Sequence, residues 1–215
     1  MSSFDDEILS EFVLESREHL ETIESDLLKI GDPDNPDRDT LINKVFRAAH
    51  TIKGGAGFLG LDTIQELAHR AENVLDRVRA GDIEPKPDVV NLLLQSFDQL
   101  SEMIDDHAAS QDADVSELCD GLTDLLSSYL EEDERANLGE TVPVQGGSGD
   151  WGIAVNKYDL ARTASQGFYI YLIRLDLVRD LESKGKKPWD LIQEINSAGT
   201  ILASKIDIAA IGGLE

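Results

Sequence analysis

Five successive stretches of the chain repeat their apolar residues every three or four positions, the spacing of one face of an α-helix. They cover residues 5–30, 38–59, 62–80, 87–108 and 115–133, and the breaks between them are short. Long amphipathic helices with short connections pack side by side in opposite directions. We therefore predict a mainly α fold, in which an antiparallel four-helix bundle carries a fifth helix packed on its end.

The composition changes after residue 131, and this change predicts the domain organisation. Residues 1–133 would form the helical bundle, and the charged, then glycine-rich stretch 134–150 would be a flexible linker. Residues 151–215 read as a small α/β segment, with strands at 168–177 and 200–208 around a helix at 188–198. One β-α-β unit is a small sheet to stand alone. We expect either a fragment of a longer protein or a piece that pairs with a partner's edge.

The chain is strongly acidic, with a net charge of −24, and residues 1–140 alone account for −23. Such a surface repels nucleic-acid phosphates and anionic lipids, so we expect neither as a partner. A basic or mixed protein partner fits better. The alternative is that the acidic side chains serve only to keep the helices soluble. Without a long apolar run or a signal peptide, and with Cys119 as the single cysteine, a cytoplasmic location is expected.

The second predicted helix contains a histidine surrounded by glycines. Three of the four residues 54–57 are glycine, and each interior glycine costs about 1 kcal/mol relative to alanine. On a helical wheel, His50 falls about 180° from the apolar stripe, and Lys53, Gly54 and Gly57 follow it on the same face. The pattern predicts a solvent-facing imidazole whose glycine neighbours have no side chains, so that another molecule can come close.

The third predicted helix supplies a partner for this histidine. Helices 38–59 and 62–80 are joined by a tight turn, and His69 and Glu72 lie about as far after the turn as His50 lies before it. A carboxylate there would accept the imidazole Nδ1–H and leave Nε2 as the nucleophile. Lys53, one turn along, could neutralise an incoming phosphoryl group. The flanking Phe46 and Arg47 are either docking contacts or ordinary helix surface.

Metal and nucleotide sites are not indicated. Di-iron bundles need Glu-x-x-His on two helices with every ligand pointing inward, whereas this chain has one His-x-x-Glu, in the opposite order. The glycines at 146–149 follow no predicted strand and precede no P-loop lysine. We expect no metal and no cofactor, and we do not expect this chain to phosphorylate itself from ATP.

The run His50-Thr-Ile-Lys-Gly-Gly-Ala-Gly-Phe-Leu-Gly60 and the later run Leu67-Ala-His-Arg-Ala-Glu-Asn-Val-Leu-Asp-Arg-Val-Arg79 resemble the histidine-containing phosphotransfer (Hpt) domain. Within that family, residues 4–133 are most similar to the N-terminal domain of CheA-type chemotaxis histidine kinases. The resemblance implies that His50 accepts the phosphoryl group and that Glu72 holds its Nδ1. Lys53 and His69 would support them.

The resemblance also implies the partners. A response-regulator receiver domain would dock over Gly54 and Gly57, and an ATP-binding kinase domain, in trans or in a longer chain, would supply the phosphoryl group. Residues 168–208 are similar in layout to the small regulator-docking domain of such kinases. Two alternatives remain: a stand-alone phosphorelay carrier served by another kinase, and a non-catalytic acidic scaffold.

Overall fold

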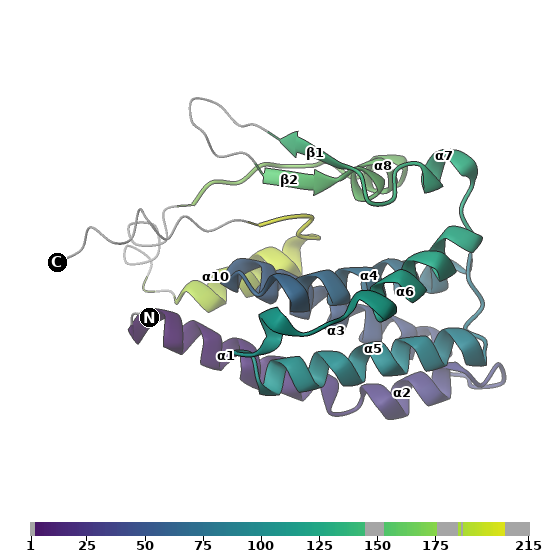
Figure 1. Cartoon of the computed structure of the whole chain (residues 1–215), viewed down its shortest axis with the longest axis horizontal. Helices are drawn as coiled ribbons and strands as arrows, with labels where there is room; N and C mark the ends of the chain where they lie inside the picture. Colours follow the sequence, from purple (N-terminus) through teal and green to yellow (C-terminus); the bar gives the residue numbers. More distant parts are fainter. Residues whose placement is uncertain (1–2, 145–152, 176–184, 186, 205–215) are drawn as a thin grey trace. The chain divides into compact units, whose positions relative to one another are not determined.

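The computed structural model describes residues 3–144, 153–175, 185 and 187–204. It divides into two units, Met1–Tyr129 and Leu130–Glu215. Figure 1 shows the helices and strands of each. None of the described helices combines the length and the apolar character needed to span a membrane.

The first unit is helical, as predicted. Its elements are α1 (Ser3–Leu20), α2 (Ile23–Ile30), α3 (Arg38–Leu59), α4 (Asp62–Ala80), α5 (Pro87–Asp105), a 3-10 turn η1 (Ser110–Asp112) and α6 (Ser116–Ser128). Consecutive helices contact one another around a closed ring, in which α1 and α2 pack on α3, α3 on α4, α4 on α5, and α5 back on α1 and α2. This is the predicted four-helix bundle. The fifth helix, α6, packs along α4 and α5 and not on the end of the bundle, so its predicted placement is wrong.

The core of the bundle consists of the apolar stripes that face inward. On α4, six apolar residues spaced three or four apart or adjacent are buried: Ile64, Leu67, Ala68, Ala71, Leu75 and Val78. Glycines in the left-handed region end both α3, at Gly60 with φ +69°, and α4, at Gly81 with φ +80°. Because residues with a Cβ rarely adopt this conformation, glycine is favoured at both helix ends.

The first predicted helix, residues 5–30, is wrong as a single element, because it breaks after Leu20 into α1 and α2. At the break, the Thr22 hydroxyl donates to the buried Asp26 carboxylate, 3.2 Å away. Lys44 on α3 donates to both Thr22 Oγ1, at 2.7 Å, and Asp26 Oδ2, at 2.6 Å. These contacts tie α2 to α3, a tertiary interaction that the apolar spacing of residues 5–30 does not reveal.

The predicted fifth helix is also shorter than expected. It ends at Ser128, and a separate short helix α7 (Glu132–Arg135) follows in the second unit. At the start of α7, the side chains of Glu131 and Glu134 form a reciprocal capping box.

The second unit contains a small antiparallel sheet of β1 (Thr141–Val144) and β2 (Ile153–Asn156), followed by α8 (Lys157–Ser165) and α10 (Pro188–Ala198). The helix predicted at 188–198 is confirmed by α10. The strand β1 lies inside the stretch predicted as linker, 134–150, and its pairing with β2 gives these short segments the hydrogen bonds that neither would have alone. Residues 145–150 of that stretch lie outside the described part.

The strands predicted at 168–177 and 200–208 do not form in the described residues 168–175 and 200–204. Seven large apolar side chains of the first segment are exposed: Phe168, Tyr169, Ile170, Tyr171, Leu172, Ile173 and Leu175. A strand needs a neighbour to accept and donate its backbone hydrogen bonds. Since the described ladder joins β1 only to β2, the β-propensity of this segment is not realised. Residues 176–177 and 205–208 lie outside the described residues.

Candidate functional site

The tight turn at Gly60 places α3 and α4 side by side and antiparallel. The Leu61 amide donates to the Ala56 carbonyl, at 2.9 Å, which closes the end of α3 before α4 begins. In this arrangement, residues at similar distances from the turn face each other, as the sequence predicts for His50 and Glu72.

The predicted pair forms. His50 Nδ1 lies 2.9 Å from Glu72 Oε1, and Lys53 Nζ lies 2.6 Å from Glu72 Oε2. One carboxylate therefore holds the histidine with one oxygen and the lysine with the other. All three side chains are at most 9% exposed.

The charge state of Glu72 determines the histidine tautomer. Burial by itself would raise the pKa of the Glu72 carboxyl, but the positive charge of Lys53 and the hydrogen bond from His50 outweigh it and lower that pKa from 4.5 to about 2. An ionised carboxylate can only accept hydrogen bonds, so the proton in the contact belongs to His50 Nδ1. In the neutral ring, Nε2 then carries the lone pair.

The predicted exposure of the histidine is wrong, because the His50 side chain is only 9% exposed. Phe46, one turn earlier on α3, stacks on the imidazole with ring centroids 6.2 Å apart and planes 12° from parallel, and Glu72 covers the Nδ1 edge. The helical wheel assumes one buried stripe, whereas α3 is packed by α1 and α2 on one side and by α4 on another.

The contacts of α3 on several sides also bury the glycines and the lysine that follow His50. Gly54 and Gly57 are buried rather than on an open face. Lys53 is also buried, and its ammonium group is bound to Glu72 instead of extending toward solvent. Lys53 therefore acts on the carboxylate that holds His50.

The remaining predicted residues take different places. His69 is half-buried, and its Nε2 accepts a hydrogen bond from the Asn73 amide at 3.3 Å. Phe46 lies against the imidazole, as noted, and Arg47 is exposed on α3.

Two residues of α4 near the site were not singled out by the sequence. The Arg79 guanidinium carbon lies 3.9 Å from the centroid of the Phe46 ring, and Arg79 Nη2 lies 2.6 Å from Asp76 Oδ1. The sequence spacing could have indicated both residues. Side chains four and then three positions apart share one helix face, and this spacing joins Phe46, His50 and Lys53 on α3. The same spacing joins Glu72, Asp76 and Arg79 on α4.

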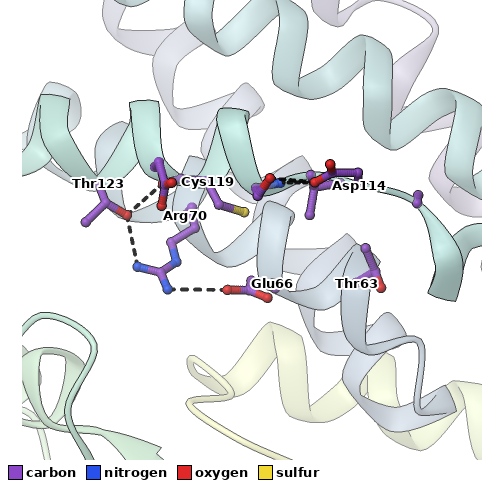
Figure 2. A pocket seen from close by; sticks show the side chains of 10 residues that line it. Thr63, Glu66, Arg70, Asp114, Cys119 and Thr123 are labelled. Atoms are coloured by element: carbon purple, nitrogen blue, oxygen red, sulfur yellow. Dashed lines mark hydrogen bonds and ion pairs between the residues drawn. The ribbon is translucent and has the colours of Figure 1, made fainter.

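A pocket of about 520 Å³ lies on another side of α4, between that helix and α6 (Figure 2). Arg70 crosses it, donating to Thr123 Oγ1 at 3.0 Å and to Glu66 Oε1 at 3.4 Å. By helix geometry Arg70 points about 160° away from Glu72 around α4. This pocket is therefore separate from the histidine site.

The described residues contain no group of three or more His, Cys, Asp or Glu side chains placed to hold a metal ion. The histidine site itself offers one imidazole and one carboxylate, and the second oxygen of that carboxylate is taken by Lys53. Its chemistry is that of an oriented nucleophilic nitrogen.

Comparison with known proteins agrees with this geometry. The family model described as the Hpt domain matches residues 7–110. The chemotaxis protein CheA of Bacillus subtilis is 30% identical over 201 residues, which cover 90% of this chain and 28% of that protein. CheA of Salmonella typhimurium is 34% identical over 157 residues, covering 72% of this chain and 22% of that protein. The chain thus spans less than a third of the length of these relatives.

A solved structure is also similar. It is a crystal structure of the phosphorylated P1 domain of CheA3 from R. sphaeroides in complex with CheY6, with a TM-score of 0.50 and 28% identity, covering 58% of this chain and 99% of that one. The helical bundle, the histidine on α3 and the matched family model lead to one assignment: residues 7–110 of this chain are an Hpt domain.

Proposed function

We propose that this chain carries phosphoryl groups on His50 in two-component signalling, as the phosphotransfer part of a CheA-type chemotaxis kinase. The observation that carries the proposal is the 2.9 Å contact between His50 Nδ1 and Glu72 Oε1. It fixes the proton on Nδ1 and leaves the Nε2 lone pair to attack phosphorus.

The proposed reaction consists of two phosphoryl transfers, one to His50 and one from it. In the first, a bond forms between Nε2 and the γ-phosphorus of ATP held by a kinase domain, and the bond from that phosphorus to the ADP oxygen breaks. The ring gains positive charge because Nδ1 keeps its proton, and the Glu72 carboxylate stabilises that charge. In the second, an aspartate oxygen of a receiver domain attacks the phosphorus, the bond to Nε2 breaks, and neutral His50 is restored.

The partners follow from this scheme and from similarity. The similar P1 domain of CheA3 was solved in complex with CheY6, which supports a receiver domain as the acceptor here. The exposed Arg47, one turn before His50, is our candidate docking residue, with Phe46 beside it. Gly54 and Gly57 are buried, so they would affect docking through the close packing of α3 and not by direct contact.

Labelling tests the proposal. The chain is incubated with γ-labelled ATP and a CheA-type kinase domain that lacks its own phosphotransfer domain. We expect acid-labile label on the wild-type chain and none on His50→Gln, whose helical circular dichroism should be unchanged. His19→Gln, at a partly exposed histidine on α1, is the matched control and should be labelled like wild type.

The second half of the test adds a receiver domain to the labelled chain. Label should move to the receiver, and it should stay on the chain when the receiver's acceptor aspartate is changed to asparagine. If the wild-type chain takes no label from any kinase domain, the proposal fails and the chain is an acidic scaffold. Label that persists in His50→Gln would place the acceptor elsewhere.

A further inference from the structure

The imidazole of His50 is held from two directions, and only one of them is the Glu72 carboxylate. On α3, the Phe46 ring lies nearly parallel to the imidazole, with 12° between the planes and 6.2 Å between the centroids. On α4, the Arg79 guanidinium lies over the Phe46 ring, 3.9 Å from its centroid. Asp76 in turn holds Arg79, at 2.6 Å.

The two supports restrict different motions. A hydrogen bond at Nδ1 fixes one atom of the ring but still lets the ring plane tilt about that atom. A flat neighbour parallel to the plane opposes this tilt. The direction of the Nε2 lone pair depends on both restraints, and transfer to phosphorus is sensitive to alignment.

Arg79 is suited to hold Phe46 in place. Phe46 is half-buried, so its outer surface is not packed on every side by apolar core. The Arg79 side chain is 36% exposed and Asp76 is 16% exposed, so this pair covers Phe46 from the rim of the bundle. A guanidinium over an aromatic ring is attracted to its face and can stack on it flat.

We infer that Arg79 is a positioning residue for phosphotransfer. It aligns the His50 ring through Phe46, and Asp76 holds the Arg79 guanidinium in place. The inference rests on the proposed function, and it adds a second support to the Glu72 contact. Arg79 acts through Phe46, so its loss should slow the transfer step without changing how the donor or acceptor domain binds.

Kinetics of phosphorylation by an excess of kinase domain separate this role from others. A cation–π contact at a partly exposed site corresponds to a factor of about two to five, and we expect Arg79→Ala to lower the maximal rate by that factor with no change in half-saturation. Phe46→Leu should lower it at least as much, and Arg79→Ala in the Phe46→Leu background should have no further effect. Arg79→Lys, which keeps a cation over the ring, should retain more activity than Arg79→Ala.

Arg70→Ala is the matched control, because Arg70 lies on another side of α4, paired with Glu66 and Thr123 (Figure 2), and it should behave like wild type. NMR of the His50 ring nitrogens adds a readout that simple destabilisation would not move. In Arg79→Ala the Nδ1–H tautomer should persist, because Glu72 remains, while the ring proton shifts caused by Phe46 should change.

The inference is overturned if Arg79→Ala has the wild-type maximal rate, if only its half-saturation changes, or if its effect adds to that of Phe46→Leu. The second result would make Arg79 a docking residue. These outcomes are distinct from failure of the proposed function, which would appear as an unlabelled wild-type chain. Should Arg79→Ala lose helical structure, Arg79→Lys compared with wild type decides the question.

Discussion

Replacing Glu72 with glutamine removes one charge from a buried site while keeping the shape of the side chain. The amide oxygen can still accept the His50 Nδ1–H, but Lys53 loses its counter-charge. The Lys53 side chain is only 6% exposed, and its described ion pair is the one with Glu72, at 2.6 Å. Glu72→Gln therefore leaves a buried ammonium group without a carboxylate.

Two estimates of the cost agree. Removing one partner of a buried ion pair costs about 3–5 kcal/mol. Independently, the lowering of the Glu72 pKa from 4.5 to about 2 corresponds to about 3 kcal/mol of stabilisation of the ionised form. We expect Glu72→Gln to lower the free energy of unfolding by about 3 kcal/mol.

Urea unfolding at pH 7, followed by helical circular dichroism, measures this loss, since most of the helix belongs to the bundle. Glu66→Gln on the same helix is the control, because Glu66 is 55% exposed and its contact with Arg70 is long, at 3.4 Å. This substitution should lower the free energy of unfolding by less than about 1 kcal/mol. The double variant Glu72→Gln/Lys53→Met should be less destabilised than the sum of its single variants, because neither charge then remains alone.

Either of two results would refute the reasoning. One is a Glu72→Gln chain within about 1 kcal/mol of wild type, which would mean that water or movement of Lys53 solvates the ammonium. The other is strict additivity of the two single variants, which would mean that the 2.6 Å contact carries no coupling in solution.

Three further predictions use other features of the structure. Because the folded pKa of Glu72 is about 2 and its ordinary value is 4.5, the stability from its ionisation is complete above pH 4.5 and is lost as the pH falls toward 2. The difference in unfolding free energy between wild type and Glu72→Gln, measured by urea titration at several pH values, should therefore narrow below pH 4.5. Burial, with help from Glu66, raises the pKa of the Cys119 thiol to about 11 from 9.0, so at pH 8 its alkylation by iodoacetamide, followed by mass spectrometry, should be about a hundredfold slower than in the urea-unfolded chain. Gly60→Ala should lower the free energy of unfolding in urea by about 1 kcal/mol, since Gly60 has φ +69°; an unchanged value would mean that the turn adjusts without strain.

The elements nearest to each other in sequence were the most predictable. A tight turn forces α3 and α4 to be antiparallel neighbours, so counting residues on either side of Gly60 was enough to pair His50 with Glu72. The same local chemistry predicted where α3 and α4 end. Both inferences use only the rise per residue of a helix and the backbone freedom of glycine.

What the sequence did not show depends on packing between distant segments. A wheel assigns one buried face to each helix, and α3 has contacts on several sides, so the burial of His50 and Lys53 was missed. The break between α1 and α2 is accompanied by Lys44 of α3 binding Asp26, which no local period encodes. The apolar segment 168–175 has strand composition, but a strand exists only where a neighbour pairs with it.

The acidity of the bundle bears directly on the chemistry at His50. Residues 1–140 have a net charge of −23, which would disfavour the approach of a phosphoryl group if every charge acted equally. Salt screens exposed charges beyond about 8–10 Å, so the groups next to the ring dominate. There, Lys53 balances Glu72 and Arg79 balances Asp76, which leaves the ring beside two neutral pairs. If His50 carries phosphoryl groups as proposed, this local balance lets a highly acidic domain accept them, because Lys53 neutralises the Glu72 carboxylate that holds the ring and Arg79 neutralises Asp76.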